Sequence, residues 1–413
     1  MQKFYDINKI KNSILLGDTL TELKKLPNDT IDTVCTSPPY WGLRSYLDDD
    51  HPDKPKEIGL EPTIDEFLVK MSAITGQLKR VLKPTGVMFF NHGDCYGGQR
   101  WSNSPGTGIY GNKRFVDGNT IAPKGNVPAK CLALQNYRLI IKMIDEQGWI
   151  LRNTIIWNKP NGMPSSVKDR FANKYEPVFM LVKNKKYWFD LDAVRVPHKT
   201  NEPVNYTRPL KSKSRSATIQ PRSKTSLVSY GIGGKNPGDV WRIPTYPFSD
   251  AHFATFPPKL IEPMIKAGCP KEICQKCGEA RVRVTETNYE QAGGKGREKY
   301  DTKNQSGGME TGSCKPQSMK HGRAMEERKK KNPQRDFCWR WSKKLNAIRK
   351  TIGWTKCQCK NPKYEAGICL DPFMGSGTTA LVARKLGRQY LGIELSAEYL
   401  KIIKKRLAQQ TLF

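Results

Sequence analysis

Two short motifs near opposite ends of the 413-residue chain carry residue types that could do chemistry. Residues 36–42 (TSPPYWG) follow an apolar, β-branched run, and residues 371–379 (DPFMGSGTT) lead into a helical pattern. Consecutive prolines lack N–H donors and have a fixed φ, so the first motif presents carbonyl acceptors in a rigid arrangement. The glycines of the second motif let the backbone approach a ligand at a helix start. Together the motifs predict group transfer between a bound cofactor and a planar amine.

The first motif could hold the exocyclic amine of a base. The Ser37 hydroxyl and the Pro38 carbonyl can accept its two hydrogens, and the Tyr40 ring offers a flat face for stacking. Bonding both hydrogens favours a pyramidal nitrogen, whose lone pair can attack a sulfonium methyl group. No strong general base is needed, because the leaving group of the cofactor supplies the driving force. The alternative is a proline-rich turn after a strand.

The second motif resembles a loop that cradles a nucleotide. A further strand pattern, at residues 390–395, ends near Glu394. An acidic residue after the second strand is where such folds hold ribose hydroxyls. The alternative is a tight strand-to-helix turn beside a surface glutamate.

The elements that must position these motifs alternate between strand and helix patterns. Thr63, followed by Glu66, forms a capping box that predicts the start of a long amphipathic helix ending before Pro84. Repeated β-α-β order predicts a doubly wound, mostly parallel sheet. The strand patterns cover residues 13–18, 32–40, 86–94, 149–160, 176–184, 367–373 and 390–395, and the helix patterns cover 19–26, 63–82, 132–148 and 376–387.

The chain is strongly basic, with 70 Lys and Arg against 39 Asp and Glu and a formal net charge of +31. Such an excess predicts a polyanionic partner, most often nucleic acid, although a lysine-rich solubilising surface is the alternative. Residues 199–235 hold eight basic residues and one acid, a net charge of +7, and are either a solvated linker or a nucleic-acid-binding insertion. We expect phosphate contacts from Arg100, Lys113, Arg114, Arg208, Lys211, Lys213, Arg215, Arg222 and Lys224.

The sequence contains no apolar run of the ~20 residues that a membrane-spanning helix needs, and its start lacks the apolar core of a signal peptide. We therefore expect a cytoplasmic protein with reduced cysteines. Cys274 and Cys277 form CxxC, Cys357 and Cys359 form CxC, and four thiolates in two close pairs suit a structural zinc ion. Cys269, Cys314 and Cys338 are possible substitutes, whereas Cys35, Cys95, Cys131 and Cys369 are expected to pack as small apolar residues.

TSPPYWGLR, DPFMGSGTT and GIE together resemble the DNA amino-methyltransferases of the permuted group, in which the catalytic motif precedes the cofactor motif. The resemblance implies a Rossmann-like, S-adenosylmethionine-dependent methyltransferase fold, with a mostly parallel seven-stranded sheet, a basic target-recognition insertion and a zinc-knuckle insertion. Family members with this insertion carry similar cysteine pairs. Further family-like blocks cover residues 59–63, 91–94, 152–170, 236–241 and 252–260.

The resemblance also implies a role for each matching residue. Ser37, Pro38, Pro39 and Tyr40 become the catalytic residues, referred to below as the claw. Glu394 would hold the ribose, and Asp18 the adenine amine, although Asp18 could also cap a helix. Asp371, Phe373, Gly375, Gly377 and Thr378 would line the methionine part of S-adenosylmethionine, and Phe253, Thr255 and Phe256 would close over its end.

Ser37, as the first residue of the claw, favours cytosine N4 as the target in this family, with adenine N6 as the alternative. Either base must be flipped out of double-stranded DNA before it can react. Two alternatives outside this reaction are a catalytically silent DNA-binding protein and a methyltransferase acting on RNA or protein. A companion restriction endonuclease is a further possible partner.

The expected organisation has five parts. Residues 1–196 form the catalytic half of the methyltransferase domain, and 366–413 form the cofactor-binding half. Residues 197–240 form the basic target-recognition insertion, 241–268 the segment that closes over the cofactor, and 269–365 the cysteine-containing basic insertion.

Overall fold

The computed structural model describes residues 4–43, 45–97, 127–162, 164–197, 234–245, 256–291 and 345–409. The chain divides into two units. The first comprises Met1–Val196, Asn236–Val284 and Gly353–Phe413, and the second comprises Pro197–Lys235 and Thr285–Ile352. The sheet, the helices around it and both motifs belong to the first unit.

The first unit is built on an eight-stranded sheet in the order β1-β12-β11-β2-β3-β5-β4-β6. All neighbouring strands are parallel except at β5, which runs antiparallel to both β3 and β4. The strands are β1 (Ser13–Leu16), β2 (Ile31–Thr36), β3 (Leu82–Asn91), β4 (Ile150–Asn158), β5 (Tyr175–Val182), β6 (Val240–Arg242), β11 (Ile368–Asp371) and β12 (Gln389–Glu394).

Sheet order brings the two ends of the chain together. β11 lies between β12 and β2, with Cys369 opposite Thr33 and Leu370 opposite Val34. β2 is buried at every position, as its apolar run requires. Since β2 and β11 are parallel, the motifs that follow them meet at the same edge of the sheet.

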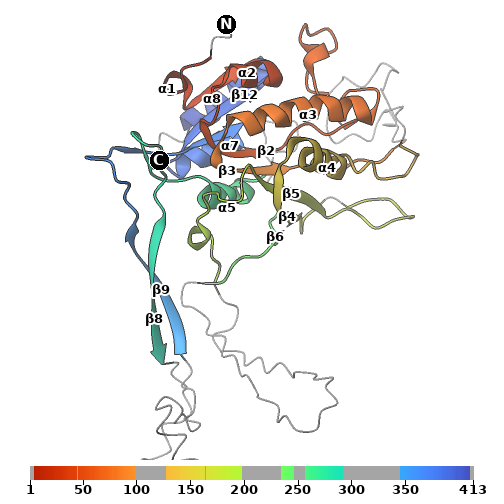
Figure 1. Cartoon of the computed structure of the whole chain (residues 1–413). Helices are drawn as coiled ribbons and strands as arrows, with labels where there is room; N and C mark the ends of the chain where they lie inside the picture. The colour runs from red at the N-terminus through yellow and green to blue at the C-terminus, as the bar shows by residue number, and fades with distance from the viewer. Residues whose placement is uncertain are drawn as a thin grey trace, which may run out of the picture. The chain divides into compact units, whose positions relative to one another are not determined.

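Helices cover both faces of the sheet (Figure 1). Along β3, Met88 and Phe90 pack into one core, whereas Val87 and Phe89 pack into the other, as expected from strand alternation. The first core contains buried residues of α2 (Thr19–Lys25), α3 (Ile64–Val81) and α4 (Gln135–Gln147). The second contains those of α5 (Pro258–Gly268), α7 (Thr378–Lys385) and α8 (Ala397–Gln409).

The predicted capping box is confirmed, because Thr63 accepts a hydrogen bond from the Glu66 amide at 3.2 Å at the start of α3. The predicted number of strands is wrong, since the sheet has eight strands rather than seven. The extra strand, β6, has only three residues and pairs in parallel with β4, so the sequence gives it no periodic signal. Helix α5 was also not predicted.

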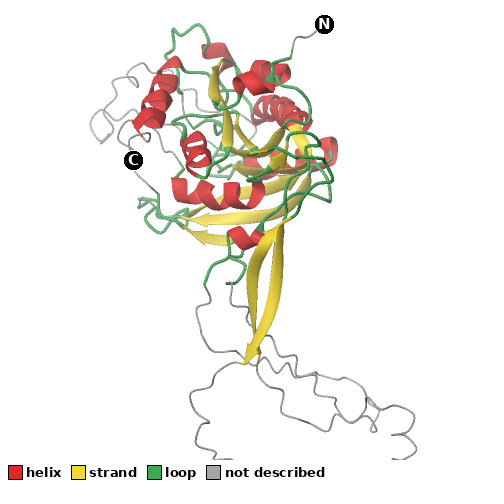
Figure 2. Ribbon diagram, turned by 90° about the vertical axis from the view of Figure 1, so that its left-hand side faces the viewer, coloured by secondary structure: helices red, strands yellow, loops and turns green. Residues whose placement is uncertain are grey.

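Smaller elements complete the described chain. A short sheet pairs β7 (Ile273–Cys274) with β10 (Tyr364–Glu365), and a two-stranded ribbon pairs β8 (Arg283–Gln291) with β9 (Leu345–Trp354) (Figure 2). The other helical turns are α1 (Ile7–Ile10), η1 (Lys54–Lys56) and η2 (Leu191–Ala193). Among the described helices, none combines the length and apolar character that crossing a membrane demands.

Candidate active site and cysteine cluster

Asp371 joins the two motifs at the edge of the sheet. Its Oδ1 accepts hydrogen bonds from the Thr36 hydroxyl at 2.7 Å and the Phe373 amide at 3.1 Å, and its Oδ2 accepts one from the Thr379 hydroxyl at 2.7 Å. The side chain is fully buried, and burial raises the pKa of its carboxyl to about 7 although these hydrogen bonds lower it. Because Thr36 directly precedes the claw, Asp371 fixes the claw beside the glycine-rich loop.

Glu394 closes the glycine-rich loop from the neighbouring strand. Its two carboxylate oxygens accept from the amides of Gly375, at 2.7 Å, and Ser396, at 2.9 Å. Burial raises the pKa of this carboxyl to about 7 as well. Gly377 has a φ of +80°, and a Cβ at this position would lie 2.9 Å from Ile403, so a glycine is required before α7 begins at Thr378.

Asp18 lies at the same edge, after β1. Its Oδ2 accepts from both the amide and the hydroxyl of Thr21, so the predicted helix-capping role is confirmed. The neighbouring Thr19 hydroxyl donates to the Pro372 carbonyl at 2.8 Å, and the Gly17 amide donates to the Glu394 carbonyl at 2.9 Å. These bonds bring the residue predicted to bind adenine close to the loop predicted to bind methionine.

Two aromatic residues predicted to contact the cofactor are described. Phe373 packs against the core that contains α2 and α3, and Phe256 packs against the core that contains α5 and α7. The other residues predicted to close over the cofactor, Phe253 and Thr255, lie outside the described residues.

The claw is anchored from behind by Trp41, which is fully buried. Its amide donates to Gln135 Oε1 at 2.8 Å, and its indole N–H donates to the Glu61 carbonyl at 2.8 Å. Pro38 is buried, whereas Ser37, Pro39 and Tyr40 are partly exposed. Hydrogen bonds to the buried Trp41 therefore hold the motif in place, while Ser37, Pro39 and Tyr40 remain partly accessible.

Tyr40 is held by residues that the sequence reasoning did not assign to the site. A Cβ on Gly93 would lie 2.6 Å from Tyr40 Cε2, and the centroid of the His92 ring lies 5.3 Å from that of Tyr40. The hydroxyl donates to Glu176 Oε2 at 3.1 Å and lies 3.5 Å from Ser37 Oγ. Burial, and then the charge of Glu176, raise the pKa of Tyr40 well above its ordinary value. The sequence carries no motif that marks Glu176 as part of the site.

His92 is fully buried beside the claw. Besides Tyr40, its ring contacts Phe67 and Phe90, with centroid distances of 6.0 Å and 5.6 Å. Burial lowers the pKa of the imidazole to about 3, so the ring is neutral at physiological pH. His92 therefore packs as an aromatic residue behind Tyr40 and brings no positive charge to the site.

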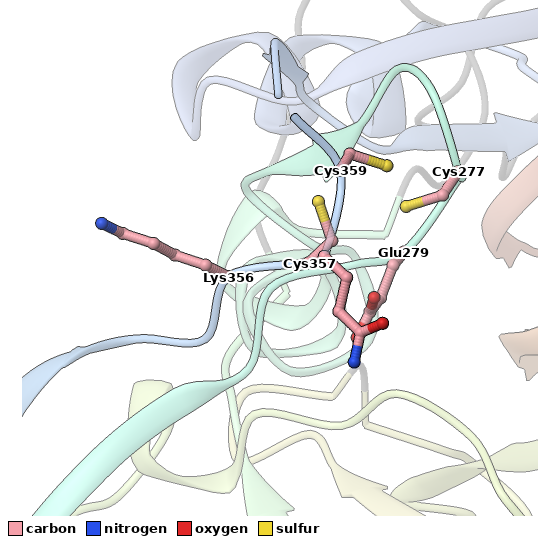
Figure 3. Close-up of a pocket in the computed structure, with 6 residues that line it drawn as sticks. Cys277, Glu279, Lys356, Cys357 and Cys359 are labelled. Atoms are coloured by element: carbon pink, nitrogen blue, oxygen red, sulfur yellow. The ribbon is translucent and has the colours of Figure 1, made fainter. Parts of the chain in front are cut away.

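The structure brings the four predicted cysteines together. The Sγ atoms of Cys274, Cys277, Cys357 and Cys359 all lie within 4.8 Å of one another. Figure 3 shows the sulfurs of Cys277, Cys357 and Cys359 turned toward a common space, with Lys356 directed away. Four thiols grouped this closely fit the tetrahedral coordination that zinc adopts in structural sites.

Backbone geometry forms one half of the cluster. Gly278 has a φ of +73° and donates its amide to the Cys274 carbonyl at 2.8 Å, which closes the turn between the first two cysteines. Tyr364 of β10 pairs with Cys274 of β7, close to the second cysteine pair. The substitute Cys269 is buried in the core, and Cys314 and Cys338 lie outside the described residues.

The predicted packing of the remaining cysteines needs one correction. Cys35, Cys95 and Cys369 are buried in the apolar cores, as expected. Cys131 is exposed, because it lies at a chain reversal where its carbonyl accepts from the Gly97 amide. The prediction that it packs as a small apolar residue is wrong.

The nine basic residues predicted to contact phosphate lie outside the described residues. They are Arg100, Lys113, Arg114, Arg208, Lys211, Lys213, Arg215, Arg222 and Lys224.

A mostly parallel sheet, with a glycine-rich loop and a proline-rich claw at the ends of adjacent strands, agrees with the S-adenosylmethionine-dependent DNA amino-methyltransferase fold that the sequence resemblance implies. The DNA methylase family model for N6 and N4 methylation matches residues 31–273 and 360–405. The chain belongs to this family and is a DNA methyltransferase, which confirms the resemblance seen in the sequence.

Relatives agree with this assignment. The type II methyltransferase M.XycI of Xanthomonas campestris pv. cyanopsidis is 37% identical over 257 residues, which cover 62% of this chain and 72% of the relative. The type II methyltransferase M.Cfr9I of Citrobacter freundii is 29% identical over 392 residues, covering 95% and 86%. The solved structure of PvuII DNA methyltransferase (cytosine-N4-specific) aligns with a TM-score of 0.48 and 16% identity, covering 95% of this chain and 85% of that chain. The assignment rests on the family match and not on this structural alignment.

Proposed function

We propose that this DNA methyltransferase transfers a methyl group from S-adenosylmethionine to the N4 atom of cytosine. The observation that supports this proposal most directly is the hydrogen bond from Thr36 to Asp371, which joins the claw to the glycine-rich loop. Cytosine is favoured over adenine because Ser37 is the first residue of the claw.

The claw acts on the target amine through hydrogen bonds. Ser37 Oγ and the Pro38 carbonyl accept the two amine hydrogens, and the Tyr40 ring stacks on the flipped base. With both hydrogens held, the nitrogen lone pair is directed toward the cofactor. Ser37, Pro38, Pro39 and Tyr40 are the proposed catalytic residues.

The glycine-rich edge holds the cofactor. When bound, S-adenosylmethionine supplies an electrophilic methyl group on a sulfonium sulfur. Glu394 would accept hydrogen bonds from the ribose, and Asp18 would accept one from the adenine amine. Asp371, Phe373, Gly375, Gly377 and Thr378 would line the methionine part, and Phe253, Thr255 and Phe256 would close over it.

Double-stranded DNA is the proposed substrate. Residues 197–240 and the basic residues near 100–114 supply phosphate contacts, which position the duplex without reading its sequence. Because the relatives are type II methyltransferases, we place this chain in a restriction-modification system, where methylation would protect a site from a companion endonuclease.

The reaction is tested by methylating duplex DNA with the purified protein and S-adenosylmethionine, then identifying the modified nucleoside by mass spectrometry. N4-methylcytosine is the expected product, and N6-methyladenine would overturn the cytosine assignment. A variant carrying Ser37→Ala and Pro38→Ala should bind cofactor and DNA but lose turnover. Normal turnover by that variant would disprove the role of the claw.

We also propose that Cys274, Cys277, Cys357 and Cys359 hold one structural zinc ion. The ion would tie the turn after β7 to the segment after β9, which are separated by about 80 residues of sequence. Metal binding of this kind contributes directly to folding stability.

Elemental analysis tests the metal site. Protein purified without chelator should contain one zinc ion per chain, and Cys277→Ser should lose it and unfold at a lower temperature. Cys131→Ser is the matched control, because this exposed cysteine lies outside the cluster. Metal-free wild-type protein whose unfolding temperature does not respond to added zinc would contradict the site.

A further inference from the structure

We infer that Glu176 of β5 is a positioning residue that orients the Ser37 hydroxyl through Tyr40, so that Ser37 presents its lone pairs to the target amine. The inference rests on the proposed function and adds a residue from a different strand to the claw. A hydrogen-bonded chain runs from Lys159 through Glu176 and Tyr40 to Ser37.

Glu176 is held at both carboxylate oxygens. The Tyr40 hydroxyl and the Asn91 side-chain amide each donate to Oε2 at 3.1 Å, and the Lys159 ammonium pairs with Oε1. Lys159 is itself fixed, with its nitrogen 4.3 Å from the centre of the Trp157 ring. Strand pairing places Trp157 opposite Glu176, which brings the lysine within reach.

The charge of Glu176 sets the direction of the chain. An ionised carboxylate can only accept hydrogen bonds, so the Tyr40 hydrogen is committed to Glu176. The Tyr40 oxygen is then left as an acceptor, with the Asn91 side-chain amide and the Ser37 hydroxyl each 3.5 Å away as donors. Contacts of this length in a ligand-free active site commonly shorten when substrate binds.

This direction matters because the target amine brings two hydrogens to the claw. The Pro38 carbonyl has no hydrogen to donate and is always an acceptor. The Ser37 hydroxyl can either donate or accept a hydrogen bond. When its hydrogen is donated to Tyr40, both lone pairs of its oxygen are free to accept from the amine. Glu176 therefore makes the serine hydroxyl behave like the neighbouring carbonyl.

Glu176→Gln tests the direction of the chain while keeping the size of the side chain. Lys159 favours the amide rotamer with oxygen toward the ammonium, which turns the NH2 group toward Tyr40 and Asn91. Tyr40 must then accept, and its hydrogen is free to point at Ser37. We expect kcat to fall about tenfold or more, because a hydrogen bond to a charged group is lost from the aligned claw. The Kd values for cofactor and DNA should change less than twofold.

A double-mutant cycle separates positioning through Tyr40 from a general structural role. Tyr40→Phe keeps the stacking ring but interrupts the chain, so Glu176→Gln should cause no further loss of kcat in that background. Additive losses, or wild-type kcat for Glu176→Gln alone, would overturn the inference.

The matched control is Asp192→Asn. Asp192 pairs with Arg195, and both side chains are 18% exposed, compared with 22% and 20% for Glu176 and Lys159. Asp192 lies in η2, after the end of β5 that is farther from the claw. Its variant should retain wild-type kcat. Each assay begins with product identification on the wild-type enzyme, so that failure of the proposed cytosine chemistry is recognised before the variants are compared.

Discussion

Glu394 and Asp371 stand at the ends of neighbouring strands, and burial raises the pKa of each carboxyl to about 7. Their surroundings differ. Asp371 is fully buried and accepts from two threonine hydroxyls, which suits a residue that fixes the claw to the loop. Glu394 is partly exposed and accepts from backbone amides, which leaves lone pairs for a ligand.

This difference predicts that cofactor affinity depends on pH through Glu394. In the proposed site the ribose hydroxyls would donate to the ionised carboxylate, so bound cofactor would favour the charged form and lower the pKa of Glu394. With a pKa of about 7 in the free protein, only about a tenth of the carboxyl groups are ionised at pH 6. The Kd for S-adenosylmethionine should therefore be about tenfold weaker at pH 6 than at pH 8, as measured by isothermal titration calorimetry.

Glu394→Gln supplies the baseline for this measurement. A glutamine cannot ionise, so any pH dependence that remains in this variant comes from the amine of the cofactor and from other titratable groups. The variant should bind more weakly at pH 8 and lose the part of the pH dependence that belongs to Glu394. An identical pH profile in wild type and variant would show that Glu394 does not contact the ribose.

At the scale of elements, the sequence predicts the helices and strands that are encoded by patterns of neighbouring residues. The apolar run of β2 and the capping box of α3 identify these elements without tertiary information. Helix α5 has apolar residues at helical spacing (Leu260, Ile261, Met264, Ile265), but Pro263 within the helix obscures the pattern. The three residues of β6 become a strand only by pairing with β4.

The same limit applies to the site. Ser37 and Glu394 belong to motifs that are continuous in sequence, so their types and spacing were informative. Glu176 reaches Tyr40 only because antiparallel β5 lies beside β3, with Val178 opposite Asn91. No local pattern encodes that neighbour, so the position of Glu176 could be recognised only in the folded sheet.

Gly93, just after β3, is predicted to be essential for the geometry of the claw. Gly93→Ala would place a Cβ 2.6 Å from Tyr40 Cε2, a separation that real structures do not tolerate, so the ring must move. We expect kcat to fall at least tenfold with little change in cofactor Kd, since a displacement of about 1 Å can cost a hundredfold in rate. Initial rates and cofactor titrations measure both effects.

Gly76→Ala is the matched control in α3. The nearest atom to its added Cβ lies at 3.8 Å, an ordinary contact, and replacing a glycine inside a helix stabilises the fold by about 0.5–1 kcal/mol. This variant should unfold at a slightly higher temperature and keep full activity. If Gly93→Ala also retained wild-type kcat, the close approach to Tyr40 would have no functional role.

At the scale of the whole molecule, permuted motif order has a simple structural reason. The glycine-rich loop comes last in the sequence, but β11 enters the sheet between β12 and β2. The first strand, β1, then pairs with β12, so residues from both ends of the chain meet at the edge of the sheet where the cofactor is proposed to bind. The sequence between the motifs supplies strands β3 to β6, the cysteine cluster and both basic insertions.

The net charge of +31 predicts how DNA binding responds to salt. Each phosphate contact releases condensed counterions, so the logarithm of the binding constant falls against the logarithm of salt concentration with a slope of about −0.9 per contact. Neutralising six basic residues of the 197–240 insertion should reduce the slope by about five if all six contact phosphate. Fluorescence anisotropy of a labelled duplex measures this slope. The six are Arg208, Lys211, Lys213, Arg215, Arg222 and Lys224.

A charge-matched variant separates specific contacts from the overall field of the protein. It neutralises six exposed lysines outside the insertion, namely Lys9, Lys24, Lys271, Lys385, Lys401 and Lys404. Both variants lose the same net charge, so long-range attraction weakens equally, but only the insertion variant loses direct phosphate contacts. The slope should therefore change much more in the insertion variant. Equal slopes in the two variants would assign the salt dependence to net charge alone and remove the insertion from the DNA interface.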